Sequence, residues 1–335
     1  MVTGLEESVQ FVARAYNNLV LNQHKGTITK TSKVAKLADE INYYQELPEE
    51  VKHLFPRVVD STIDHVNSNY ELTMEYYPFP NVGQMLCTET SMVRWDNFLS
   101  SLGHAISLLN KQKENDLNDN LRKAWRKAMY VEKTEREYDN LRTKFPFFQK
   151  LCNQTTLSIN GKLCTNFDGL WSQLRKFIAD NYCTRDKFTV IHGDMCFANI
   201  LCGFDQEDNA TIKFVDPRGS FGGCGTVGDV YYDLAKLRHS VHGNYELIIN
   251  DQFKLSVSSS LTDVSFVFNP LLATDLLSLF NQRLFSNYDE LKIKMLEGLI
   301  FISMCARHYD SEARQIVMYC TGVQLLNKCL EEINE

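Results

Sequence analysis

The stretch that decides the fold runs from His192 to Leu201 and reads "HGDMCFANIL". The apolar pair Val190–Ile191 precedes it and predicts the end of a strand, and Ile200 begins the next apolar run. The polar residues therefore lie on a connecting loop, and loops held by a rigid scaffold are where chemistry concentrates. Downstream, "ILCGF" and "TIKFVD" flank "DQEDN", which predicts a β-hairpin over 200–216.

Two polar side chains are expected to converge at one end of this hairpin. Asn199 opens the hairpin and Asp216 closes it, so both lie at the same edge. An amide oxygen and a carboxylate suit Mg²⁺, a hard cation that prefers oxygen ligands. Asp194, on the preceding loop, is positioned to accept a proton from a hydroxyl, and His192 to orient the loop backbone. This arrangement is used for phosphoryl transfer, and H-G-D-x-x-x-x-N parallels the kinase pattern H-R-D-x-x-x-x-N.

Three motifs in order, "HGDMCFANIL", "IKFVDPRGSFG" and "GDVYYDLAKL", resemble the aminoglycoside phosphotransferase and choline kinase superfamily of kinase-like small-molecule phosphotransferases. The motifs cover about residues 188–240. The resemblance implies an α+β, protein-kinase-like fold with two lobes and with ATP and Mg²⁺ between them. Residues 1–80 would form a small β-rich nucleotide-binding lobe, with a hinge near 75–82. Residues 83–335 would form a larger, helical lobe for catalysis and substrate binding.

The resemblance also assigns roles. Asp194 would be the catalytic base, Asn199 and Asp216 the magnesium ligands, and His192 a residue that orients the loop. Asp233 resembles the family aspartate that hydrogen-bonds the catalytic-loop backbone, which is a structural role.

The N-terminal part would hold the nucleotide. The kinase pattern requires a strand lysine that reaches the phosphates and a helix glutamate that pairs with it. Lys30 in "ITKTS" and Glu40 in "LADEIN" fit, with Lys33 and Lys36 as nearby competitors for the lysine role. "MEYYPFPN" resembles the hinge, where the backbone from Glu75 to Tyr77 would meet adenine.

Two departures from the family pattern bear on the substrate. The expected nucleotide-covering loop, "NNLVLNQHKG", has no glycine before Gly26. "PRG" follows the metal aspartate, so Arg218 is expected beside the metal site, where it favours an anionic substrate or the transferring phosphate and disfavours a plain choline site. "DPRGSFG" and the late "SMCARHYDSEARQ" are also similar to kinase-like proteins of capsule and cell-surface polysaccharide gene clusters. Candidate acceptor contacts, each equally compatible with a solvated helix face, are Arg238, His239, His242, Arg307, His308 and Arg314.

The hydrophobic pattern predicts strands early in the chain and helices late, with the hairpin interrupting the helical part. Strands are predicted at 26–32 and 70–77, whereas the type of 5–22 stays open. The charged stretch from 114 to 145 is expected to be a solvated helix face. Further helices are predicted at 36–48, 91–145, 170–183, 231–241 and through the chain's last sixty or so residues.

Composition narrows the class. A length of 335 residues favours two lobes, and a net charge of −7 argues against a general nucleic-acid or membrane-surface binder. The ten cysteines form no C-x-x-C pair, so we expect buried thiols in a reducing cytoplasm and no zinc site. The acidic start does not resemble a signal peptide, and no apolar run reaches the ~20 residues of a membrane helix. Gly223-x-Gly225-x-x-Gly228 follows no predicted strand, so we expect a flexible loop and not a dinucleotide-binding turn.

These observations predict an ATP-dependent kinase that phosphorylates a hydroxyl of a small polar molecule: a sugar, polyol, amino alcohol or surface-polysaccharide precursor. Two alternatives share the fold: a nucleotide-binding pseudokinase without turnover, and a protein kinase. The missing D-F-G and A-P-E signatures disfavour a protein kinase. A plain scaffold would bind no nucleotide.

Overall fold

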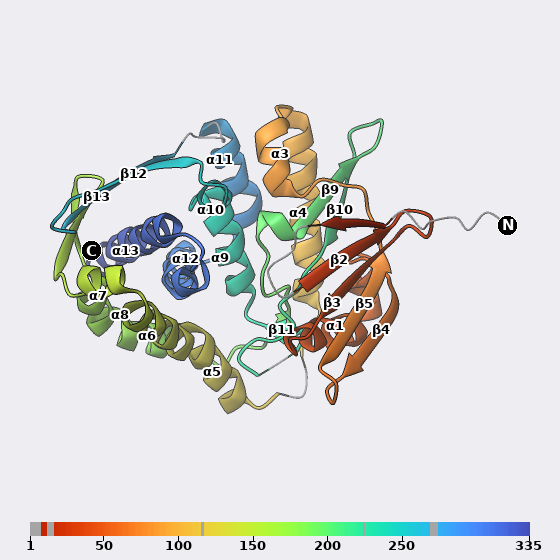
Figure 1. Ribbon diagram of the computed structural model, residues 1–335, viewed down its shortest axis with the longest axis horizontal. Coiled ribbons are helices and arrows are strands. Elements are labelled where there is room, and N and C mark those ends of the chain that lie inside the picture. Colours follow the sequence, from red (N-terminus) through yellow and green to blue (C-terminus); the bar gives the residue numbers. More distant parts are fainter. Residues whose placement is uncertain (1–7, 12–16, 115–116, 224, 269–273) are drawn as a thin grey trace. The chain divides into compact units, whose positions relative to one another are not determined.

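The computed structural model describes residues 8–11, 17–114, 117–223, 225–268 and 274–335. The chain divides into two compact units, which are described separately (Figure 1). Unit 1 comprises Met1–Lys113 and Thr189–Gly228, and unit 2 comprises Glu114–Phe188 and Asp229–Glu335. A β-rich N-terminal region and a mostly helical C-terminal part confirm the predicted kinase-like α+β class. The lobe boundary near residue 80 stays a prediction.

Unit 1 is built on a five-stranded antiparallel sheet in the order β1-β2-β3-β5-β4. The predicted strands at 26–32 and 70–77 are confirmed as β3 and β5. Tyr70, Leu72 and Met74 alternate as buried residues along β5, and α1 packs against β5 and β4. The strands are β1 Ser8–Phe11, β2 Asn17–Asn22, β3 Thr27–Ser32, β4 Val58–Asp64 and β5 Asn69–Glu75.

Strand β4 was not predicted from the sequence. Its segment "VVDSTID" has polar residues at 60–62, and none of its residues is fully buried. Among the described strands, β4 pairs with β5 alone, at the edge of the sheet, and it carries a bulge between Val58 and Asp60. An edge strand with a bulge lacks the two-residue hydrophobic period that sequence prediction depends on.

The helices of unit 1 fix the predicted hairpin in place. The hairpin is confirmed, with β9 paired to β10 in register from Ile200↔Phe214 to Phe204↔Ala210. Helix α4 packs against β10 and buries an apolar stripe that includes Trp95, Phe98 and Leu102. The remaining elements of unit 1 are α1 Lys36–Glu46, α2 Glu49–Lys52, α3 Val82–Thr88, α4 Met92–Lys111, β8 Thr189–Val190, the 3-10 turn η2 Phe197–Asn199, β9 Ile200–Phe204, β10 Ala210–Phe214 and β11 Val227–Gly228.

Unit 2 is organised around helix α12, which contacts α13, α9 and α6. Gly298 on α12 and Gly322 on α13 allow a close approach, since a Cβ on Gly298 would lie 2.9 Å from the side chain of Leu326. The helices are α5 Asp119–Lys127, η1 Ala128–Glu132, α6 Lys133–Lys144, α7 Pro146–Cys152, α8 Phe167–Asn181, α9 Val230–Val241, α10 Tyr245–Ile249, α11 Thr274–Phe280, η3 Asn281–Phe285, α12 Glu290–Met304, η4 Cys305–Arg307 and α13 Glu312–Asn334.

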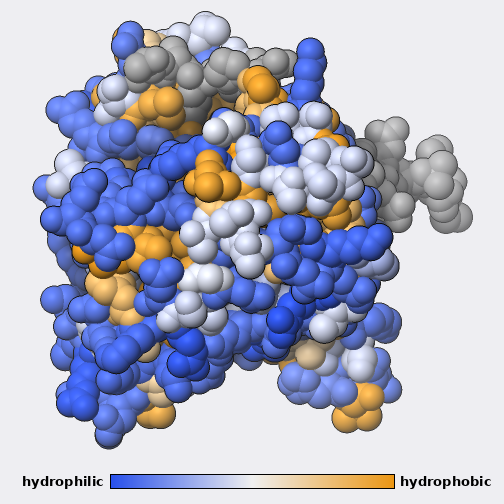
Figure 2. Space-filling model, turned by 90° about the vertical axis from the view of Figure 1, so that its left-hand side faces the viewer, coloured by the Kyte–Doolittle hydropathy of each residue, from blue (hydrophilic) through white to orange (hydrophobic). Residues whose placement is uncertain are grey.

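Unit 2 also contains a four-stranded sheet in the order β12-β13-β6-β7. The prediction that strands occur late only as one hairpin is therefore wrong. Buried Val264 and Phe266 alternate with exposed residues along β13, which is the two-residue period of a half-buried strand. Figure 2 views the side of the molecule that carries this sheet; its surface is largely hydrophilic, with scattered small apolar groups. The strands are β6 Thr156–Ile159, β7 Lys162–Thr165, β12 Phe253–Val257 and β13 Asp263–Phe268.

The charged stretch is helical in α5, η1 and α6, but the prediction that it is a solvated face is wrong for four residues. Arg122, Arg126, Lys133 and Glu137 are buried. Arg126 donates from Nε to Asp229 Oδ2 at 2.8 Å, and Arg122 lies 2.6 Å from Glu114 Oε1. Buried charges need such partners, which cannot be recognised from charge density along the sequence alone.

The thiols agree with the prediction in the part of the chain that the structure describes. Eight cysteines there are buried and none of the eight forms a disulfide. Among the described helices, none has the length and apolar character needed to cross a membrane.

Candidate functional site

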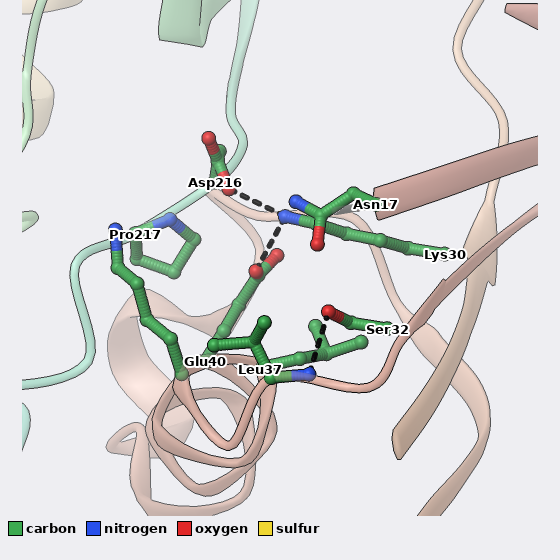
Figure 3. A pocket seen from close by; sticks show the side chains of 9 residues that line it. Asn17, Lys30, Ser32, Leu37, Glu40, Asp216 and Pro217 are labelled. Carbon is green, nitrogen blue, oxygen red and sulfur yellow. Dashed lines mark hydrogen bonds and ion pairs between the residues drawn. The ribbon is translucent and has the colours of Figure 1, made fainter. Parts of the chain in front are cut away.

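A buried lysine between two carboxylates forms the centre of the candidate site in unit 1 (Figure 3). Lys30 Nζ lies 2.6 Å from Glu40 Oε2 and 2.5 Å from Asp216 Oδ1. β3 supplies the lysine, α1 the glutamate, and the end of β10 leads into Asp216. Lys30 and Glu40 are 8% and 5% exposed, whereas the Asp216 side chain is 48% exposed. The site therefore opens at Asp216.

The ion pairs of this trio favour the charged forms of Lys30 and Asp216. Burial acts to lower the pKa of Lys30, but the carboxylates of Glu40 and Asp216 outweigh it and raise the pKa above its usual value. Burial raises the pKa of Asp216, yet the Lys30 ammonium more than offsets this and holds the pKa below its usual value. Lys30 is therefore a fixed cation, and Asp216 an anion, at neutral pH.

A pocket opens beside the trio. Figure 3 shows the Asn17 side chain next to the Lys30 amine, with Ser32 and Leu37 below them in the view. The lining residues are Asn17, Lys30, Ser32, Val34, Lys36, Leu37, Glu40, Asp216 and Pro217. Sequence reasoning missed Asn17 and Ser32, because they match no motif and lie beside Lys30 only once the strands pair.

His192 joins the catalytic-loop candidate to the hairpin. Its Nδ1 accepts from the Asp194 backbone N–H at 3.2 Å, so its Nε2 carries the proton and donates to the Val215 carbonyl at 3.0 Å. Burial lowers the pKa of His192, which keeps this neutral tautomer. The ring stacks on Phe55 with an interplanar angle of 7°. A single imidazole thus holds the Asp194 backbone at a fixed position relative to the residue that precedes Asp216.

Asn199 is oriented by the same loop. Its Nδ2 donates to the Asp194 carbonyl at 2.9 Å, and the Val215 N–H donates to the Asn199 carbonyl at 3.0 Å. In this amide orientation Oδ1 is the atom that could serve as a metal ligand. Asp216 has a φ of +58°, a left-handed conformation that costs energy in a non-glycine residue and is typical of functional sites. As expected from the hairpin, Asn199 and Asp216 lie at one edge.

The competing lysines differ in their surroundings. Lys33 Nζ donates to Asn69 Oδ1 at 3.2 Å and does not line the pocket, whereas Lys36 does line it. The geometry of the ion pairs thus favours Lys30 for the phosphate role, which stays a prediction.

The hinge candidate is held by side chains. The Glu75 carboxylate accepts from Arg57 Nε at 2.9 Å and from the Tyr77 hydroxyl at 3.3 Å. The hairpin packs closely here, because a Cβ on Gly203 would lie 2.4 Å from the Phe79 ring. The side chains of Glu75 and Tyr77 thus help to fix the shape of this segment. The expected contact of its backbone with adenine stays a prediction. The predicted covering loop "NNLVLNQHKG" forms β2 and the turn that follows it, while the β1–β2 connection, 12–16, lies outside the described residues.

Arg218 follows the candidate metal ligand as predicted and is held by the loop. Its backbone N–H donates to the His192 carbonyl at 2.9 Å, and its Nε donates to the Ser220 carbonyl at 2.9 Å. Gly193 allows the contact, since its φ is +77° and a Cβ there would lie 2.7 Å from Arg218 Cβ. The glycine in H-G-D is thus explained by packing.

The remaining predicted residues belong to unit 2, where Asp233 and His239 are buried. Arg238 pairs with the fully buried Glu297, and His239 stacks on Tyr245 at 4.4 Å. The other acceptor candidates also have partners within unit 2: His242 with Asn281, Arg307 with Glu137, His308 with Tyr245, and Arg314 with Asp251. Their acceptor roles stay predictions.

Two structural residues were missed by sequence reasoning. The Tyr43 hydroxyl donates to the Ile191 carbonyl at 2.9 Å and so ties α1 to the start of the candidate catalytic loop. Asp229 caps α9 by accepting from the Tyr231 N–H at 3.1 Å. The aspartate before the α9 helical pattern was a readable capping signal.

The glycine-rich match at 223–228 is not a dinucleotide-binding turn. Gly228 lies in strand β11 and packs against Ile191, since a Cβ there would lie 2.4 Å from Ile191 Cδ1. No βαβ unit contains the match among the described residues.

Gly219→Ala is expected to lower the free energy of unfolding by about 2–3 kcal/mol, because two costs add. Gly219 has a φ of +72°, and a Cβ there would lie 2.4 Å from the Asp39 carbonyl, next to Glu40 on α1. Gly26→Ala is the matched control, since its φ is +60° and nothing lies within 4 Å. Urea denaturation should show the larger loss at Gly219. Equal losses would mean that the approach to α1 is not the cause.

Comparison with known proteins shows which solved structures share this fold. No protein-family model and no curated protein matches the chain. The chain is similar to the solved GDP and kanamycin complex of APH(2")-IIia, with 13% identity, a TM-score of 0.55, and 98% of this chain and 94% of that chain covered. It is also similar to a thermostable mutant of the aminoglycoside phosphotransferase APH(4)-Ia, with 9% identity, a TM-score of 0.54, and 96% and 94% covered. A third is the streptomycin–ATP–APH(2")-IIa ternary complex, with 12% identity, a TM-score of 0.51, and 96% and 91% covered.

Proposed function

We propose that this chain, which has the fold of the aminoglycoside phosphotransferases, transfers the γ-phosphate of ATP to a hydroxyl of a small polar molecule. The observation that carries the proposal is the Lys30–Glu40–Asp216 trio, joined through His192 and Asn199 to the loop of Asp194. A fixed cation for phosphates beside a half-exposed carboxylate is what this chemistry requires.

The residues at the hairpin edge fit a divalent cation. The Asn199 amide oxygen and the Asp216 carboxylate are hard oxygen donors. Hydrogen bonds with the backbone hold Asn199, and the ion pair with Lys30 holds Asp216. We assign Mg²⁺ to this pair. When bound, Mg²⁺ offsets the negative charge of the nucleotide phosphates.

In the proposed reaction, Asp194 accepts the proton of the acceptor hydroxyl. The hydroxyl oxygen forms a bond to the γ-phosphorus as the bond from that phosphorus to the ADP oxygen breaks. Lys30 orients the phosphates and Glu40 holds Lys30 in place. His192 and Asn199 act as positioning residues for the loop. Most of the rate enhancement then comes from positioning and charge neutralisation.

For the acceptor we propose a sugar, polyol, amino alcohol or surface-polysaccharide precursor in the cytoplasm. Of the similar structures, one holds kanamycin and another holds streptomycin. Arg218 near the site favours an acceptor with an anionic group. Arg238, His239 and His308 remain candidates for contacts with the acceptor, and Asp233 remains a candidate for a structural role.

A panel of hydroxyl acceptors with Mg-ATP tests this function. We expect ADP release that depends on one class of acceptor, measured by a coupled assay. Nucleotide binding with no acceptor-dependent release would instead indicate a pseudokinase, and phosphorylation of peptides would indicate a protein kinase. Absence of nucleotide binding, by calorimetry or thermal shift, would contradict the proposal outright.

Asp216→Asn is expected to remove most of the effect of Mg²⁺ on ATP affinity. Removing an outer-shell partner of a metal ligand already costs about 10- to 100-fold in metal affinity, and losing an anionic ligand itself should cost at least as much. The measurement is the ratio of ATP dissociation constants in EDTA and in Mg²⁺. Asp60→Asn, an equivalent change on the exposed strand β4, should leave the ratio unchanged. An unchanged ratio in Asp216→Asn would place the metal elsewhere.

A further inference from the structure

A second lysine lines the candidate phosphate pocket. Lys36 is the first residue of α1 and, like Lys30, lines the pocket with Asp216. Unlike Lys30, Lys36 is exposed, and no described carboxylate lies within ion-pair distance of its Nζ. Its charge is therefore available to a ligand.

The charge balance of the pocket depends on Lys36. Glu40 and Asp216 are two anions, and Lys30 supplies one cation to balance them. Without Lys36 the lining would be net negative before any metal binds, and it would repel a polyphosphate.

The backbone at the start of α1 cannot replace this side chain. The N–H groups of Leu37 and Ala38 already donate to the carbonyls of Val34 and Ala35, at 3.2 and 2.9 Å. An anion at this end of α1 must therefore be bound chiefly by side chains. A lysine on a flexible stem suits that task, because its ammonium can follow a phosphate without fixed geometry.

We propose that Lys36 is a second phosphate-contacting residue, which makes the pocket select nucleotides by the number of their phosphates. The inference rests on the proposed function for the identity of the ligand. Lys30 is committed to Glu40 and Asp216 and supplies the fixed charge. Lys36 supplies the adjustable charge, and its contribution grows from adenosine to AMP, ADP and ATP.

Lys33 provides a matched control. It precedes Lys36 by three residues and is also exposed, but its Nζ donates to Asn69 Oδ1 at 3.2 Å and it does not line the pocket. Lys33→Gln and Lys36→Gln therefore remove the same charge from neighbouring positions, and only one of these positions faces the ligand.

Calorimetry with ATP, ADP, AMP and adenosine tests the proposal on the full chain. Lys36→Gln should weaken ATP binding about tenfold and leave adenosine binding unchanged, while Lys36→Arg restores ATP affinity. The loss should shrink at high salt, because an exposed charge is screened. Lys33→Gln should match the wild type.

Two outcomes overturn the inference alone: equal ATP affinities in Lys36→Gln and Lys33→Gln, or equal weakening of ATP and adenosine in Lys36→Gln, which would indicate a structural effect. If the wild type binds ATP but transfers no phosphate, the proposed function fails and the test of Lys36 still stands. If the wild type binds no ATP, both fail together.

Discussion

Asp194→Asn is expected to lower the rate of phosphoryl transfer by at least about 100-fold, with ATP affinity unchanged. Asparagine has the shape of aspartate but cannot accept the hydroxyl proton, and a positioned base contributes about 10²- to 10⁴-fold. The contacts that shape the loop use the backbone of Asp194, since its N–H donates to His192 and its carbonyl accepts from Asn199. The substitution therefore keeps them. Steady-state turnover and calorimetric ATP binding measure the two effects separately.

The control for this prediction is Asp60→Asn, the same chemical change on the exposed strand β4, where turnover should be that of the wild type. Loss of ATP affinity in parallel with turnover would contradict the role of Asp194 as base. Turnover within about tenfold of the wild type would point to another proton acceptor.

Asp229→Asn is expected to lower the free energy of unfolding by about 3–5 kcal/mol, the usual result of removing one partner from a buried charge cluster. Asp229 is 3% exposed, and its Oδ2 lies 2.8 Å from Arg126 Nε and 3.1 Å from Lys292 Nζ. The asparagine would leave two buried cations without a counter-charge. Chemical denaturation measures the loss.

The same cluster predicts a pH dependence. Burial acts to raise the pKa of Asp229, but Lys292 and Arg126 outweigh it and lower the pKa to about 2. A carboxylate with a lowered pKa stabilises the folded chain fully above its unfolded pKa of about 4, and loses that contribution as the pH falls towards 2. Between pH 5 and 3 the wild type should therefore lose more stability than Asp229→Asn.

Asp263→Asn, on an exposed position of β13, is the control for Asp229 and should stay within about 0.5 kcal/mol of the wild type. A second variant, Asp229→Asn with Arg126→Met, should recover part of the loss because one unpaired cation is gone. If Asp229→Asn and Asp263→Asn changed the free energy of unfolding by equally small amounts, the charge cluster would contribute little to stability.

The parts of the site that follow from local chain geometry could be predicted from sequence. A short hairpin returns the chain to its start, so Asn199 and Asp216 had to meet at one edge. Lys30 on a strand and Glu40 on the next helix, ten residues later, match the strand lysine and helix glutamate of the kinase pattern. The hairpin, α1 and the two early strands were predicted for the same reason.

Features that depend on distant partners could not be predicted. The buried charges of α5 look like a solvated face until Asp229, about a hundred residues later, is brought beside Arg126. The sheet of unit 2 pairs β6 with β13 in parallel across a long sequence separation. Lys36 and Lys33 were equivalent in the sequence, and only the direction of the strand and helix places Lys36 at the pocket.

The central claim is that phosphate is transferred to a hydroxyl and not to water. The most direct measurement is ³¹P NMR of Mg-ATP with the best acceptor from the panel, for the wild type and for Asp194→Asn. The account predicts a new phosphomonoester resonance that grows as the γ-phosphate signal of ATP declines, and no change with Asp194→Asn. Inorganic phosphate as the only product, or no reaction despite bound ATP, would contradict it.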